Sequence, residues 1–355
     1  MSLYYFAALI FQAVPSLSEP LPSKPTSWIC PFDYISTSVP AAQWLSLLTA
    51  CLAPLVIHIA AGVPSPTIIG GNESLEKPPW SERLPHFNPS SILWRYYAIA
   101  DRRWRSKSWS REDLAATNAL FWDGERWDGS EVIMARSRNF PSKLPNSTHV
   151  DFLSGSTLAT ITMTIQGAYS IFIVVTNSSM SNLADFFAPL AVIGLFRLQS
   201  AFWLSDEGAY LPFNNWDGPI MTTPFEARVS EELYSAWGWR GVIFRSWWIC
   251  SMAGLAGYAL HSCIGDLPTT WAPDVCYYAS NILERVFYTV LTVGAFTIHS
   301  FYVLRGQSRT TLIPCIQTMW YKIYTYLLIL LALLGIAFSI VETGLGWFPL
   351  YDKGV

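Results

Sequence analysis

Long apolar segments alternate with polar ones along this chain. Five of them are apolar over about 18 residues or more, enough to cross a hydrocarbon core of about 30 Å as a helix. A sixth carries the uninterrupted apolar run 327–332. The six segments cover residues 42–62, 156–176, 185–204, 241–263, 283–304 and 323–345. The pattern predicts an all-α integral membrane protein with about six transmembrane helices.

The first 15 residues are also apolar, but they are too short to span comfortably. As an uncleaved anchor they would add a seventh helix at the N-terminus, and as a signal-like segment they lack the usual basic start. The chain then divides into an N-terminal apolar segment and lumenal stretch (1–41), a first span (42–62), a cytosolic insert rich in Trp and Arg (63–155), a five-helix membrane domain (156–345) and a short lumenal tail (346–355).

Lys and Arg residues set the predicted orientation, because cytoplasmic loops carry their excess. Residues 177–184 and 264–282 contain none, whereas 205–245 and 305–322 contain three each. The first two loops are therefore predicted to be lumenal, and the long insert, which contains twelve Lys and Arg over 66–153, cytosolic. Of the three N-x-S/T sequons only Asn177 would face the lumen, so it is the one candidate glycosylation site.

The insert contains two predicted helices. Residues 91–109 mix Leu and Trp with five basic side chains, a pattern typical of an amphipathic helix lying among lipid headgroups. This interpretation is preferred to a partner-binding helix. Ser110 and Asp113 have the spacing of a capping box, which predicts a second short helix ahead of Leu114–Trp122.

A Trp-Asp-Gly tripeptide occurs three times, at 122–124, 127–129 and 216–218. Asp-Gly is a turn dipeptide, and Trp would anchor such a turn at the membrane interface. The alternative is an acid held beside an aromatic wall, where it could serve as a proton donor.

Composition narrows the function classes. The chain is 52% hydrophobic and 13% charged, and its net charge is −3, which gives no attraction to nucleic acid. Six scattered cysteines form no C-x-x-C pair, and no nucleotide or metal motif occurs. We expect no cofactor and no nucleic-acid partner.

Three ionisable residues share the predicted cytosolic leaflet: Arg197, Arg245 and His299. A charge inside a span is costly unless it reaches the interface, and Arg197 is placed too deep for that explanation. The site hypothesis is an acid-rich and aromatic lid over a membrane cavity that contains these three residues. A structural ion-pair network is the rival hypothesis. The acids of the lid are Asp206, Glu207, Asp217, Glu226, Glu231 and Glu232.

Acid catalysis in a dry pocket needs only such residues. A buried carboxylic acid would protonate an epoxide or olefin, and aromatic faces would stabilise the resulting cation. The candidate catalytic residues are Asp217, Asp206, Asp123, Arg197 and His299. The expected partners are a lipidic, prenylated substrate and membrane lipids.

Several spans, a long Trp- and Arg-rich hydrophilic insert and lone acids without metal motifs together resemble the fungal transmembrane terpene cyclases of meroterpenoid pathways. The resemblance covers the layout and carries over no catalytic position. It implies an isomerase-type enzyme of the endoplasmic reticulum membrane that cyclises a farnesylated precursor by protonation, without a metal.

Other functions remain open at this point. A membrane-bound acyltransferase of the wax-synthase kind would use a buried histidine, for which His299 or His261 is available. A transporter would be expected to show repeat symmetry between its spans, and none is found. A non-catalytic accessory protein would use the Trp-Asp-Gly turns as interaction loops.

Overall fold

The structure is a computed structural model. It describes residue 59 and residues 62–68, 77–138, 141–176, 191–205, 208–210, 233–265 and 279–344.

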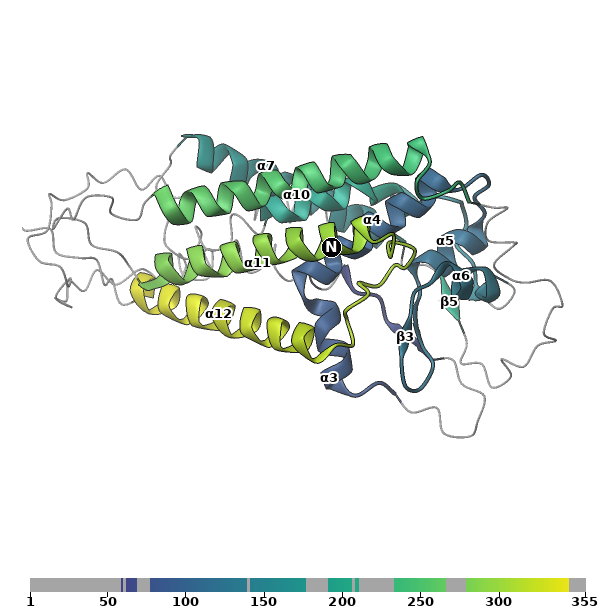
Figure 1. The fold of residues 1–355 in the computed structure, drawn as a ribbon, viewed down its shortest axis with the longest axis horizontal. Helices are drawn as coiled ribbons and strands as arrows, with labels where there is room; N and C mark the ends of the chain where they lie inside the picture. The colour runs from purple at the N-terminus through teal and green to yellow at the C-terminus, as the bar shows by residue number, and fades with distance from the viewer. Residues whose placement is uncertain are drawn as a thin grey trace, which may run out of the picture.

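Four long helices run along the longest axis of the molecule (Figure 1). α10 packs against α11, and α11 against α12. Each of the four coincides closely with one predicted apolar segment. They are α7 (Gly155–Thr176), α10 (Trp239–Gly265), α11 (Ala279–Leu304) and α12 (Met319–Gly344).

A small mixed α/β part lies at one end of these helices, on the right in Figure 1. Its three-stranded sheet has the order β1-β2-β3, with β1 parallel to β2 and β2 antiparallel to β3. A second sheet pairs β4 with β5. The strands are β1 (Pro66–Ile68), β2 (Leu120–Trp122), β3 (Trp127–Asp128), β4 (Pro141–Lys143) and β5 (Ala209–Tyr210).

Short helices complete the fold between and beside these elements. α5 has the full capping box between Ser110 and Asp113, which confirms the predicted helix start, although the helix ends before β2 rather than running to Trp122. The short helices are α3 (Trp80–Arg83), η1 (Leu84–Phe87), α5 (Arg111–Asn118), α6 (Glu131–Ser137), η2 (Leu195–Gln199) and η3 (Ala201–Trp203).

Helix α4 (Pro89–Arg105) forms the centre of the molecule. It starts where Asn88 accepts a hydrogen bond from the Ser90 amide and Pro89 occupies the first turn. Fourteen of its 17 residues are buried, and it contacts α10, α11, η1 and η2. The prediction that this segment lies on the surface among headgroups is therefore wrong. Several of its basic side chains have partners inside the protein, so the helix is buried over most of its length.

The predicted fold class, an all-α membrane protein with about six or seven spans, is also wrong. Two small sheets are present, and among the described residues two helices are long and apolar enough to cross a membrane, over Ile282–Leu304 and Met319–Val341. The segment 185–204 forms no continuous span, since its described part passes into the short helices η2 and η3. Most of 42–62 and all of the first 15 residues lie outside the described residues.

Candidate functional site

The C-terminal half of α4 carries a closed network of buried charges. The Asp101 carboxylate accepts a hydrogen bond from Arg105 Nε at 2.8 Å and two from Arg245, each at 3.2 Å. Arg105 also pairs with Glu131 on α6. All four side chains are buried. Each acid therefore has a guanidinium partner, and the network ties α4 to α10 and α6.

Arg102, in the same half of α4, contacts the mixed α/β part. It donates to the carbonyl oxygen of Gly129 and, at 3.2 Å, to that of Arg309. Burial lowers the pKa of Arg102 to about 10. The Arg102 side chain thereby links α4 to the β3–α6 connection and to the segment before α12.

Two buried nitrogen atoms at the N-terminal half of α4 have no hydrogen-bond partner among the described residues, and the same holds for Arg102 Nε and Arg245 Nη1 at the C-terminal half. Arg95 Nη2 donates to the Asn118 carbonyl oxygen at 2.7 Å, but Arg95 Nη1 has no acceptor. His86 Nε2, from η1, is likewise without a partner. The two side chains are 7% and 6% exposed. Unsatisfied buried groups of this kind are costly, so they mark a place where a ligand or water belongs.

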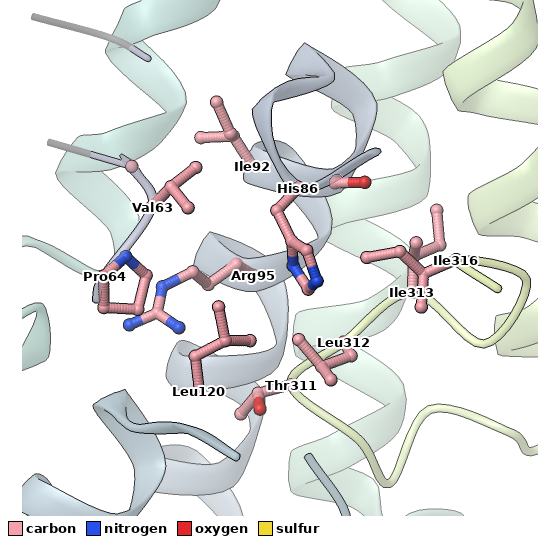
Figure 2. A pocket seen from close by; sticks show the side chains of 12 residues that line it. Val63, Pro64, His86, Ile92, Arg95, Leu120, Thr311, Leu312, Ile313 and Ile316 are labelled. Carbon is pink, nitrogen blue, oxygen red and sulfur yellow. The ribbon is translucent and has the colours of Figure 1, made fainter. Parts of the chain in front are cut away.

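Both residues line one small hollow, hereafter the Arg95–His86 hollow (Figure 2). It lies between α4, η1, β2, the chain before β1 and the segment before α12. Its volume of about 10 Å³ is room for one water-sized group. Aliphatic side chains form most of the remaining wall: Val63, Pro64, Ile92, Leu312, Ile313 and Ile316.

In the hollow, the Arg95 side chain is positively charged and the His86 imidazole is neutral. Burial, together with the charges of Arg95 and Arg83, lowers the pKa of His86 to about 3. Burial also lowers the pKa of Arg95 to about 10, and the nearby cations Arg197 and Arg102 act in the same direction. At neutral pH Arg95 carries a positive charge and His86 does not.

Asp123, one of the predicted catalytic acids, lies at an exposed turn between β2 and β3. Its carboxylate accepts hydrogen bonds from the amides of Glu125 (2.9 Å) and Arg126 (2.6 Å), and Gly124 has a φ of 101°. This first Trp-Asp-Gly unit is thus a turn. In the second unit Asp128 accepts from the Ser130 amide at 2.8 Å, immediately before α6.

Arg197 is buried, as expected, but hydroxyl groups surround it. Its Nε donates to Thr160 Oγ1 and its Nη2 to Ser156 Oγ, each at 2.9 Å, and its guanidinium lies 5.8 Å from the centre of the Tyr96 ring. A carboxylate or a polar cavity was the predicted partner of Arg197. The Ser and Thr side chains that α7 supplies take that place.

His299 is fully buried between two partners. Its Nδ1 accepts a hydrogen bond from Trp248 Nε1 at 3.1 Å, and because an indole can only donate, Nε2 carries the proton that it donates to the Ser90 carbonyl oxygen at 3.1 Å. In this arrangement neither nitrogen is available as a general base.

The three residues of the predicted cavity do not share one. Arg197, Arg245 and His299 each have separate partners, and none lines the Arg95–His86 hollow. Asp206, Asp217 and Asn177 lie outside the described residues, as does most of the predicted lid.

Sequence analysis did not single out Arg95 or His86. A signal for Arg95 exists in the sequence, since it is the one charged residue in the otherwise apolar or aromatic run 92–100. A charge within such a run is buried with it unless the side chain can reach solvent. His86 has no comparable signal, because its burial depends on the fold of η1 against β3.

Comparison of the chain with protein-family models, with curated proteins and with solved structures finds no match in any of the three.

Proposed function

We propose that this chain is a membrane-associated enzyme that acts on an apolar small molecule and holds it by a polar oxygen group. The observation that carries the proposal is the Arg95–His86 hollow, where two buried nitrogens without a described partner lie in a mostly aliphatic wall that also includes Ser91 and Thr311. Polar atoms placed in an apolar surround are typical of sites that orient small organic ligands.

A lipidic substrate is supported by the two apolar helices. α11 and α12 contain the segments that are long and apolar enough to cross a membrane, and the hollow is lined in part by the segment that joins them. We propose that the substrate enters the hollow from the bilayer. We place the protein in the endoplasmic reticulum membrane as part of this proposal.

The reaction we propose is the metal-free cyclisation of a prenylated precursor, by protonation of an epoxide or olefin. Asp206 and Asp217 are the proposed proton donors. The buried acids Asp101 and Glu131 do not suit that role, because arginine side chains already occupy them in ion pairs.

The test is incubation of microsomes that contain the full chain with an epoxidised farnesyl-phenol, followed by mass spectrometry. A cyclase gives an isomeric product of unchanged mass. Arg95→Gln should lower product formation by about tenfold or more, since a charge-assisted hydrogen bond to the substrate is lost. The matched control is Arg126→Gln, on the exposed hairpin turn, which should leave the product yield unchanged.

Two outcomes would contradict the proposal. A product heavier by one water would indicate hydrolysis instead of cyclisation. No conversion of several prenylated substrates by the wild-type chain would remove the cyclase hypothesis altogether.

A further inference from the structure

We propose that the Arg95–His86 hollow binds one deprotonated oxygen, that of a carboxylate or phenolate, at the end of an otherwise apolar molecule. This inference rests on the proposed function and deepens it, since it names the polar group by which the substrate is held. A neutral alcohol or a free small anion would bind more weakly.

The donor atoms decide which kind of group fits. An arginine side chain has hydrogen-bond donors and no acceptor, so the missing partner of Arg95 Nη1 has to be an acceptor. His86 Nε2 is a second buried nitrogen without a described partner at the hollow, and Figure 2 shows the Arg95 guanidinium turned toward Pro64, away from the His86 ring. The acceptor that Arg95 Nη1 lacks is therefore the atom that defines the ligand.

The charge balance favours an anion over a neutral acceptor. In the C-terminal half of α4 the carboxylates of Asp101 and Glu131 offset the arginines. Around Arg95 the charged groups that act on it are the cations Arg102 and Arg197, and no described carboxylate forms an ion pair with it. A buried cation without a counter-charge is unfavourable, and an anionic oxygen would supply that charge.

The volume of the hollow and its lining side chains indicate what the rest of the ligand is like. About 10 Å³ accommodates one oxygen atom and not the four oxygens of a phosphate or sulfate. The aliphatic side chains around it, among them Ile92, Ile313 and Ile316, offer no further polar partner. The remainder of the molecule is therefore apolar where it leaves the hollow.

The experiment measures binding, without turnover. The purified full chain in nanodiscs of zwitterionic lipid is equilibrated with radiolabelled octanoate, and uptake by empty nanodiscs is subtracted. We expect saturable binding that Arg95→Gln weakens by about tenfold or more and that Arg126→Gln leaves unchanged. Unlabelled octanoate should displace the label, whereas octanol and acetate at the same concentration should displace much less.

A second variant keeps the test informative if Arg95→Gln fails to fold. Val63→Phe adds bulk to the wall of the hollow and leaves both nitrogens in place, so it should also weaken octanoate binding. Equal binding by the wild type and both variants would overturn the inference. Displacement by octanol as strong as by octanoate would overturn the anionic preference, and equal displacement by acetate would overturn the apolar requirement.

Failure of this inference is distinguishable from failure of the proposed function. Octanoate binding together with an inactive chain in microsomes would leave the site standing and remove the cyclase. A cyclised product without octanoate binding would do the reverse.

Discussion

Two buried arginines of α4 have different partners, and we infer different roles for them from those partners. Arg95 and Arg105 lie on the same helix and both are buried. Arg105 holds two carboxylates, whereas Arg95 holds a backbone carbonyl and leaves one nitrogen open. We interpret the first as a structural residue and the second as a binding residue.

The two arginines should differ in stability measurements. Arg105→Gln leaves the Glu131 carboxylate buried without its ion-pair partner and should lower the free energy of unfolding by about 3 to 5 kcal/mol. Arg95→Gln strands no carboxylate and should have a much smaller effect. Denaturant unfolding in a mild detergent compares them, and a larger loss for Arg95→Gln would contradict the distinction.

Acid should destabilise the protein through His86. The folded pKa of about 3 lies below the unfolded value of 6.5, so between these values the unfolded chain binds more protons. The contribution of His86 to stability is complete above pH 6.5 and falls by roughly 1.4 kcal/mol per pH unit toward pH 3. Thermal unfolding at pH 7.5 and pH 5 should show a smaller difference for His86→Gln than for the wild type. An unchanged difference would contradict the neutral, buried imidazole.

At the scale of elements, one close approach joins the mixed part to the segment before α12. Gly129 follows β3, its carbonyl oxygen accepts from the Thr311 amide at 2.9 Å, and Arg102 donates to the same oxygen. A methyl group at Gly129 would lie 2.6 Å from Thr311 Oγ1 and 3.0 Å from the Leu312 amide nitrogen. The backbone of residues 311–312 would have to shift to make room for that methyl group.

Gly129→Ala should therefore weaken the fold. Overpacking of this kind costs about 1 to 3 kcal/mol of unfolding free energy. The matched control is Gly155→Ala at the start of α7, where a methyl group meets nothing within 4 Å and the change should stay within about 0.5 kcal/mol. Equal unfolding midpoints for the two variants would show that the 311–312 segment can yield.

Sequence patterns predicted some elements well because those elements depend on local signals. The capping box at Ser110 and the turn at Asp123-Gly124 are made by neighbours in the chain. The location of α4 is different, since its charges are satisfied by Asn118, Glu131 and Arg245. A helix with basic residues and tryptophans suits either a headgroup layer or a core with distant counter-charges. Its own sequence does not distinguish the two.

At the scale of the whole molecule, α12 presents a largely apolar surface. Leu330 and Leu333 are 54% and 59% exposed, whereas Leu328 on the opposite side is 3% exposed. An apolar outer surface on a helix of this length suits a lipid environment. Among the described residues fewer helices qualify as spans than predicted, because apolar length alone does not separate a lipid-facing helix from one that packs around a polar centre.

Membrane retention should depend on that outer surface. The wild-type chain should stay in the pellet after alkaline carbonate extraction of microsomes. Leu333→Lys places a charge that costs about 3 kcal/mol in a helix centre and should release a measurable fraction. A lysine at exposed Arg126 of the hairpin is the control and should change nothing. Release of the wild-type chain by carbonate would contradict membrane insertion of α11 and α12.

The candidate site could be predicted only in part. Arg197 and His299 were expected to share a membrane cavity, whereas the structure buries each of them among a separate set of partners from other elements. The Arg95–His86 hollow needs β2, η1 and the segment before α12 to meet at one place. Such a meeting follows from the packing of the fold and has no signature in the linear sequence.

The central place of α4 has a consequence for biosynthesis. Its partners are encoded far downstream: Arg245 follows Asp101 by 144 positions, His299 follows Ser90 by 209 and Thr325 follows Asn88 by 237. A ribosome therefore releases α4 long before the chain that buries it exists. The nascent segment has to be kept from aggregating or from misinserting until α10, α11 and α12 emerge, so a chain stopped after α7 should be a substrate for quality-control proteolysis.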